Sequence, residues 1–228
     1  MLSQAEKGGV QNTIQNCVTV LQNDPVLADS IRLNLLSERI DIVKPMGWQR
    51  SGPTLTDTDM MYILRRMEKY GLYSEKRVSA AIRIVANENH YHPIRDYLND
   101  LKWDGTERIS HALHRFLGAA EDELTAEALK IFLLGAIKRV FHPGCKFEMM
   151  LCLVGGQGAG KSSFFRLLAI KDEWFSDDLR RMDDDNVFRK LQGHWIMEMS
   201  EMIATANAKS IEEIKSFLSK QKEIGRAH

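Results

Sequence analysis

The sequence predicts an α/β fold in two parts, with a mainly helical domain over residues 1–144 in front of a core over residues 145–228. Apolar residues recur with helical spacing through most of the first part, and this periodicity indicates amphipathic helices. In the second part the pattern changes from Phe147, and the continuous apolar run at residues 149–154 is typical of a parallel-sheet strand buried on both faces. We place the domain boundary near Gly144, because the His-Pro-Gly sequence that ends there stops the preceding helix.

Capping residues, prolines and apolar faces predict the elements of the first part. Residues 11–36 are interpreted as helices broken at Asn23-Asp24-Pro25, and residues 40–43 as a short strand. A helix begins within residues 56–59, and its apolar face, with spacing i, i+3, i+4, i+7, starts at Met60. Further helices are predicted over residues 75–89, 93–101 and 124–141, with a turn at residues 103–106 between the last two.

Charge and cysteine usage limit the compartment and the classes of partner. The 31 basic and 31 acidic residues cancel, so any DNA contact must come from a local patch or a partner. Three cysteines without paired spacing favour a reducing cytoplasm. No apolar run approaches the roughly 20 residues of a membrane span, so we expect a cytoplasmic protein with no membrane partner. One basic segment offers a DNA contact, although a solvated helix face is the favoured interpretation: Lys209, Lys215, Lys220 and Lys222.

A glycine-rich loop follows the predicted strand. Its motif, G-x-x-x-x-G-K-[ST], is matched by Gly155, Gly156, Gln157, Gly158, Ala159, Gly160, Lys161 and Ser162, and Ser163 continues into the next helix. The glycines let backbone N–H groups turn inward toward phosphate oxygens. Lys161 supplies charge for the β- and γ-phosphates, and Ser162 offers its hydroxyl to Mg²⁺ at the positive end of the helix. The loop therefore predicts a P-loop NTPase core that binds a nucleoside triphosphate, ATP, with Mg²⁺.

Hydrolysis also needs an acid that holds magnesium and a base that orients the attacking water. A short apolar strand after His194 ends in two carboxylates, Glu198 and Glu201. On a regular strand these two positions face opposite ways, so both reach the phosphates only if the strand ends near Met199. We assign Glu198 to the magnesium ion and Glu201 to the water. A strand end with two solvated carboxylates is the alternative.

Three other features are interpreted without a functional role. The run Asp183-Asp184-Asp185 is typical of a solvated loop or helix start. A zinc site from His90, His92 and Cys145 lacks a second paired motif. The four tryptophans are interpreted as anchors of the core or of turns rather than as platforms for bases.

These residues, taken in order along the chain, resemble the virulence-associated protein E family, P-loop proteins of prophages and pathogenicity islands. The resemblance covers roughly residues 12–222. Besides the glycine loop, its landmarks are residues 91–98, 101–105, 116–118, 143–147, 173–175, 193–201 and 214–218.

The resemblance implies an ATPase core like those of superfamily 3 helicases, which serves the replication of a mobile element and acts as a homo-oligomeric ring. It also implies functional acids at Glu198 and Glu201 and a functional lysine at Lys215. Glu148 stands where the family commonly has aspartate. The family usually runs on beyond Glu223 through further strands and an arginine finger, so the resemblance implies a truncated, frameshifted or partial product with an incomplete core.

Two other functions remain open on the sequence. A small-molecule kinase shares the loop, but it needs an arginine-rich lid and an acceptor pocket that the sequence does not reveal. A nucleotide-responsive assembly module without robust catalysis needs only the loop. Hydrolysis that DNA stimulates distinguishes a helicase-like ATPase from both.

Overall fold

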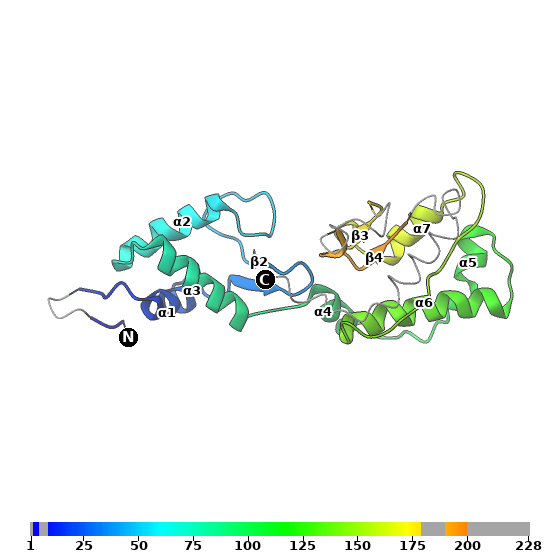
Figure 1. Ribbon diagram of the computed structural model, residues 1–228, viewed down its shortest axis with the longest axis horizontal. Coiled ribbons are helices and arrows are strands. Elements are labelled where there is room, and N and C mark those ends of the chain that lie inside the picture. The colour runs from blue at the N-terminus through cyan, green and yellow to red at the C-terminus, as the bar shows by residue number, and fades with distance from the viewer. Residues whose placement is uncertain (1, 5–8, 179–189, 200–228) are drawn as a thin grey trace. The chain divides into compact units, whose positions relative to one another are not determined.

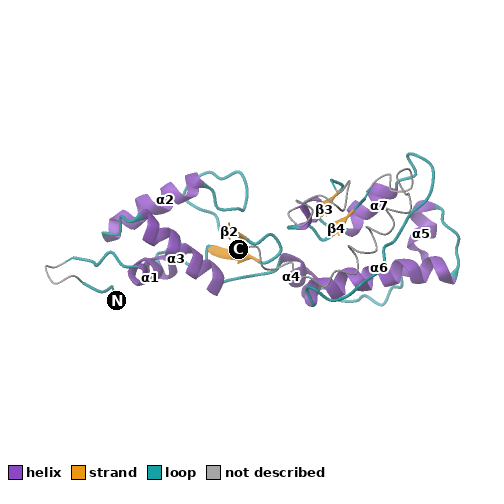
Figure 2. Cartoon of the chain, viewed as in Figure 1, coloured by secondary structure: helices purple, strands orange, loops and turns teal. Residues whose placement is uncertain are grey.

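The computed structural model describes residues 2–4, 9–178 and 190–199 (Figure 1). Helices combine with two small sheets in the described residues (Figure 2), in agreement with a mixed α/β class. The chain divides into two compact units, Met1–Pro93 and Ile94–His228, and each is described by itself. The helix that the sequence analysis predicts over residues 124–141 therefore belongs to the same unit as the glycine loop.

The elements of the first unit are α1 (Ile14–Asn23), β1 (Ile31–Asn34), β2 (Arg39–Ile42), α2 (Asp57–Met67), η1 (Glu68–Tyr70) and α3 (Glu75–Glu88). Those that follow are α4 (Pro93–Asp100), α5 (Ile109–Leu117), α6 (Glu123–Phe141), α7 (Lys161–Leu168), η2 (Asp172–Trp174), β3 (Phe175–Ser176) and β4 (Ile196–Met197). The predicted strand at residues 40–43 and the helices at 75–89, 93–101 and 124–141 are confirmed. No helix within the described ranges is both long and apolar enough to cross a membrane.

The second half of residues 11–36 was wrongly predicted as helix, because it forms part of a hairpin. Strands β1 and β2 pair antiparallel, with Ile31 opposite Ile42. The side chain of Asn34 accepts hydrogen bonds from the N–H groups of Leu36 and Ser37 and closes the turn between the strands. This local turn chemistry competes directly with helix formation, and the apolar spacing of the segment does not reveal it.

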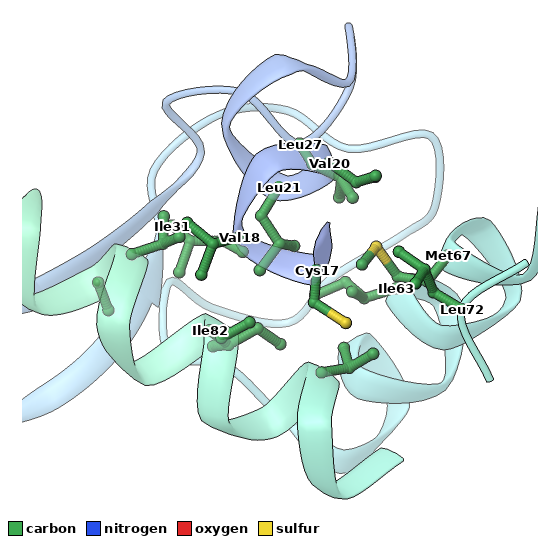
Figure 3. Close-up of a cluster of buried hydrophobic side chains, with 14 of the residues drawn as sticks. Cys17, Val18, Val20, Leu21, Leu27, Ile31, Ile63, Met67, Leu72 and Ile82 are labelled. Carbon is green, nitrogen blue, oxygen red and sulfur yellow. The ribbon is translucent and has the colours of Figure 1, made fainter. Parts of the chain in front are cut away.

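The core of the first unit lies between α1 and α3, with side chains from α2 and the hairpin (Figure 3). Cys17 and Leu21 of α1 and Ile82 of α3 are almost fully buried in it. Ile63 and Met67, on the predicted apolar face of α2, are also fully buried. Burial of this apolar surface is the main term that stabilises the unit.

A buried carboxylate fixes the start of α2. Thr56 caps the helix, and Asp59 completes a capping box by accepting from the Thr56 N–H at 2.9 Å. The same carboxylate accepts from Trp48 Nε1 at 2.7 Å and from Arg50 Nε at 2.8 Å. Burial alone would raise the pKa of Asp59, but the hydrogen bonds from Arg50, Trp48 and Thr56 outweigh it and hold that pKa far below its ordinary value.

The depressed pKa of Asp59 predicts a pH-dependent stability. The ionised Asp59 carboxylate makes its full contribution to the free energy of unfolding above the ordinary carboxyl pKa of about 4. This contribution is lost as the pH falls below that value. We expect Asp59→Asn to lower the free energy of unfolding by about 3 kcal/mol at pH 7, because it removes one partner of a buried ion pair. Denaturant titrations at pH 7 and pH 3 measure both effects. The exposed Asp57→Asn is the matched control, and an equal loss in the two variants would contradict the assignment.

The core of the second unit joins α5, α6 and α7. Leu113 of α5, Leu129 of α6 and Phe164 of α7 are buried together. Helix α6 begins at a true cap, since the Asp122 side chain accepts from the Thr125 N–H at 2.8 Å. Helices α5 and α6 provide the surface against which α7, the helix that follows the glycine loop, packs.

Residues 147–154 form no β-strand, so the prediction of a strand buried on both faces is wrong. Leu151 and Leu153 pack against the helical core, whereas Met149 and Val154 are 55% and 78% exposed. A strand buried on both faces belongs to a sheet that is covered on both faces, whereas this segment is paired with no strand within the described ranges, where β3 and β4 pair with each other. The segment is attached to α6 through Phe147, whose carbonyl accepts from Arg139 at 2.9 Å.

Strands β3 and β4 form a two-stranded parallel sheet, with Phe175 opposite Ile196. Trp195 donates its backbone N–H to the carbonyl of Trp174 at 2.7 Å, and the two indole rings meet edge to face at 6.2 Å. Trp195 also donates its ring N–H to the Ala136 carbonyl of α6 at 3.3 Å. The predicted anchoring role of the tryptophans is confirmed for these two, but not for Trp103, which is 83% exposed.

Candidate nucleotide-binding site

The glycine loop, residues 155–160, lies exposed in front of α7. Gly158 and Gly160 adopt φ angles of +80° and +79°, a left-handed backbone that L side chains rarely adopt. The Ala159 N–H donates to the Gly156 carbonyl at 3.4 Å across the turn. The glycines at these two positions of the motif are therefore required by the backbone itself.

Helix α7 presents its N-terminal end to this loop. Gly160 is its N-cap residue, and no side chain caps the first turn. The Phe164 N–H donates to the Gly160 carbonyl at 2.9 Å, as the first turn of the helix requires. Phe164 and Phe165 are buried, and Phe165 meets Phe132 of α6 edge to face at 5.8 Å. Since α7 is firmly packed and its first N–H groups carry no side-chain cap, its positive end suits an anion.

Lys161 folds back over the loop. Its ammonium donates to the carbonyls of Gly155 at 2.8 Å and Gly156 at 2.7 Å. An ammonium group has three donors, so these two contacts leave the group able to donate to a further acceptor. The lysine charge is thus held at the mouth of the loop.

Ser162 and Glu198 are brought into direct contact, although 36 positions separate them in the sequence. The Ser162 hydroxyl donates to Glu198 Oε1 at 2.7 Å. Glu198 directly follows β4, and its backbone N–H donates to the Ser176 carbonyl of β3 at 2.8 Å. The parallel sheet therefore positions the carboxylate against the first turn of α7.

The donor set of this pair fits a magnesium ion. Glu198 Oε2 is buried and has no hydrogen-bond partner in the described part of the chain, and an unpaired buried carboxylate oxygen is costly unless a cation or donor satisfies it. Magnesium prefers oxygen ligands and takes only one or two from a protein. The hydroxyl of Ser162 and the carboxylate of Glu198 are neighbouring oxygen donors of that kind.

The other predicted site residues are placed as follows. Gln157, Ala159 and Ser163 are exposed on the loop and the first turn of α7. Glu201 and the basic segment that includes Lys215 lie outside the described residues, as does the aspartate run at residues 183–185. In the first unit a shallow cavity of about 490 Å³ opens over residues 44–53, and none of the predicted site residues lines it.

Two contributions to the site were missed by the sequence analysis. Ser176 provides the carbonyl that holds the Glu198 backbone, but a strand of two residues gives almost no periodic signal. The side chain of Leu117, at the end of α5, lies within van der Waals distance of where a Cβ on Gly160 would be, at 3.8 Å.

The second unit is therefore a mixed helical and parallel-sheet domain that exposes a glycine loop at a helix N-terminus. Residues 98–228 match the family model described as the virulence-associated protein E-like domain. This match spans more than half of the chain, and the chain belongs to that family. No curated protein compared with the chain shows a significant match.

Proposed function

We propose that this chain binds ATP with Mg²⁺ at residues 155–163 and hydrolyses it in support of the replication of a mobile DNA element. The observation that carries the proposal is the 2.7 Å contact between Ser162 and Glu198. It joins the serine of a phosphate-binding motif to an acid at the end of a neighbouring strand, the two groups that hold magnesium in P-loop NTPases.

Phosphate binding rests on three groups that converge on the loop. Gly158 and Gly160 have left-handed φ angles, a conformation found in the backbone turns that form anion-binding concavities. The N-terminus of α7, which has no side-chain cap, adds its own donors and its dipole. Lys161 supplies the full positive charge, already held by the Gly155 and Gly156 carbonyls. Little side-chain entropy is therefore lost when phosphate binds.

The cation would be held by Ser162 and Glu198, and when bound it neutralises charge on the β- and γ-phosphate oxygens. The hydroxyl oxygen of Ser162 and the unpaired Oε2 of Glu198 would be the protein oxygens that hold it. Glu201 remains our proposal for the group that orients the attacking water. The link to replication rests on membership of the family, together with the resemblance to helicase-like ATPases.

Titration of the chain with fluorescent ATP, in Mg²⁺ and then in EDTA, tests the binding step. We expect saturable binding that Mg²⁺ strengthens and that inorganic tripolyphosphate displaces. Absence of saturable binding in Mg²⁺ would contradict the proposal that the chain binds ATP.

Phosphate release with and without single-stranded DNA tests the rest. Hydrolysis that DNA accelerates supports the helicase-like function. Binding without hydrolysis would instead favour the nucleotide-responsive assembly module, and hydrolysis indifferent to DNA would remove the link to replication.

A further inference from the structure

An exposed aromatic ring lies beside the glycine loop and has no part in phosphate binding. Phe116, in the last turn of α5, is 66% exposed. Single exposed apolar side chains are ordinary on protein surfaces, so it is the position of this ring, and not its exposure alone, that calls for an explanation.

The ring is held close to the start of α7. Its neighbour Leu117 lies 3.8 Å from the position a Cβ would take on Gly160. The centroid of the Phe116 ring is 6.5 Å from that of Phe164, and the two planes are tilted by 41°. Phe164 is itself bonded through its N–H to the Gly160 carbonyl. The Phe116 ring thus lies near the first turn of α7, and the side chain of the next residue, Leu117, lies near the last glycine of the loop.

We infer that Phe116 is the platform on which the purine base of the bound nucleotide stacks. The inference rests on the proposed function, because it names the subsite for the base at the same phosphate loop. Only the ribose separates the base of a nucleotide from its phosphates, so a base bound with its phosphates in the loop must lie close to the loop's edge. Phe116 is an exposed ring close to the first turn of α7, and it directly precedes the residue that approaches Gly160.

The aromatic ring of Phe116 can stack on the flat face of a base, and this interaction does not depend on the hydrogen-bonding groups of the base. Stacking of a base on an aromatic side chain contributes about 1–3 kcal/mol. The Arg115 guanidinium lies 5.7 Å from the centroid of the Phe116 ring, where it reinforces the ring through a cation–π contact. Because every purine has a stacking face, this subsite is expected to accept ATP and GTP with similar affinity.

Competition binding of Phe116→Ala with ATP and with inorganic tripolyphosphate, both in Mg²⁺, tests the inference. We expect the affinity for ATP to fall about 5- to 100-fold, the equivalent of the stacking contribution, while the affinity for tripolyphosphate stays unchanged. Phe116→Tyr keeps the ring and is expected to bind ATP as the parent does. Tyr73→Ala removes a ring of similar exposure, 68%, from the first unit and serves as the control.

The outcomes separate the base subsite from the phosphate site. If the parent binds both ligands and Phe116→Ala changes neither, the base subsite is wrong and the proposed function stands. Equal losses of ATP and tripolyphosphate would show that Phe116 acts through the loop and not on the base, which also overturns the inference. If the parent binds neither ligand, the proposed function fails, and the subsite fails with it.

Discussion

Replacement of Lys161 by alanine should weaken binding of Mg²⁺–ATP about 10- to 100-fold. A charge-assisted hydrogen bond to phosphate contributes about 1.5–3 kcal/mol. The substitution removes that contact and the two bonds by which Lys161 closes over the Gly155 and Gly156 carbonyls. The backbone cradle and the helix dipole remain, so residual binding is expected. Fluorescent ATP titration measures the change.

Lys146→Ala is the matched control for that experiment. Lys146 is exposed, and its ion pair is with the equally exposed Glu148 at 3.0 Å. Surface pairs of this kind contribute little to stability, so the control should bind ATP as the parent does. If Lys161→Ala and the parent bind ATP equally well, the glycine loop is not the nucleotide site.

The second large effect is expected from Glu198→Gln, which should lower hydrolysis about 10- to 100-fold, as loss of a group that supports a bound metal typically does. Glutamine keeps the shape of the side chain and an oxygen that accepts from Ser162, so the local fold is preserved. What is lost is the negative charge that faces the cation. Single-turnover phosphate release over a range of Mg²⁺ concentrations measures the effect, and excess Mg²⁺ should restore part of the rate.

Glu148→Gln provides the comparison, because Glu148 is an exposed acid of the same unit that contacts only Lys146 among the described ion pairs. Its rate should match that of the parent. A rate for Glu198→Gln that also equals the parent's would show that the catalytic acid lies elsewhere.

Helix positions in this protein could be predicted from the sequence because their signals are local. Thr56 and Asp122 are caps that act on residues only three positions away, and the buried face of α2 follows the 3.6-residue period. The strand predicted in the apolar run that ends at residue 154 is wrong for the opposite reason, because strand formation does not depend on local signals alone. Whether an apolar run becomes a strand depends on partners far away in the sequence, and its own composition does not reveal them.

The residues of the candidate site also differ in whether a local sequence signal identifies them. The motif of consecutive residues at 155–162 identifies the loop, and Gly160, one of its two fixed glycines, has the left-handed backbone that favours glycine. The sequence could suggest Glu198 only as an acid after a short strand, and its contact with Ser162 emerges from the pairing of β4 with β3. The approach of Phe116 through α5 depends on the packing of three helices, for which the sequence has no local signal.

The most direct measurement is a double-mutant cycle on Ser162 and Glu198, with affinity for ATP determined in Mg²⁺ and in EDTA. Ser162→Ala, Glu198→Gln and the double variant are compared, with Glu148→Gln, at an exposed acid of the same unit outside the proposed site, as the control. If the two side chains hold one magnesium ion, each single substitution should lower affinity in Mg²⁺, the double variant should lose much less than the sum, and the coupling should vanish in EDTA. Additive losses in Mg²⁺, or the same coupling with and without the ion, would contradict a shared magnesium site.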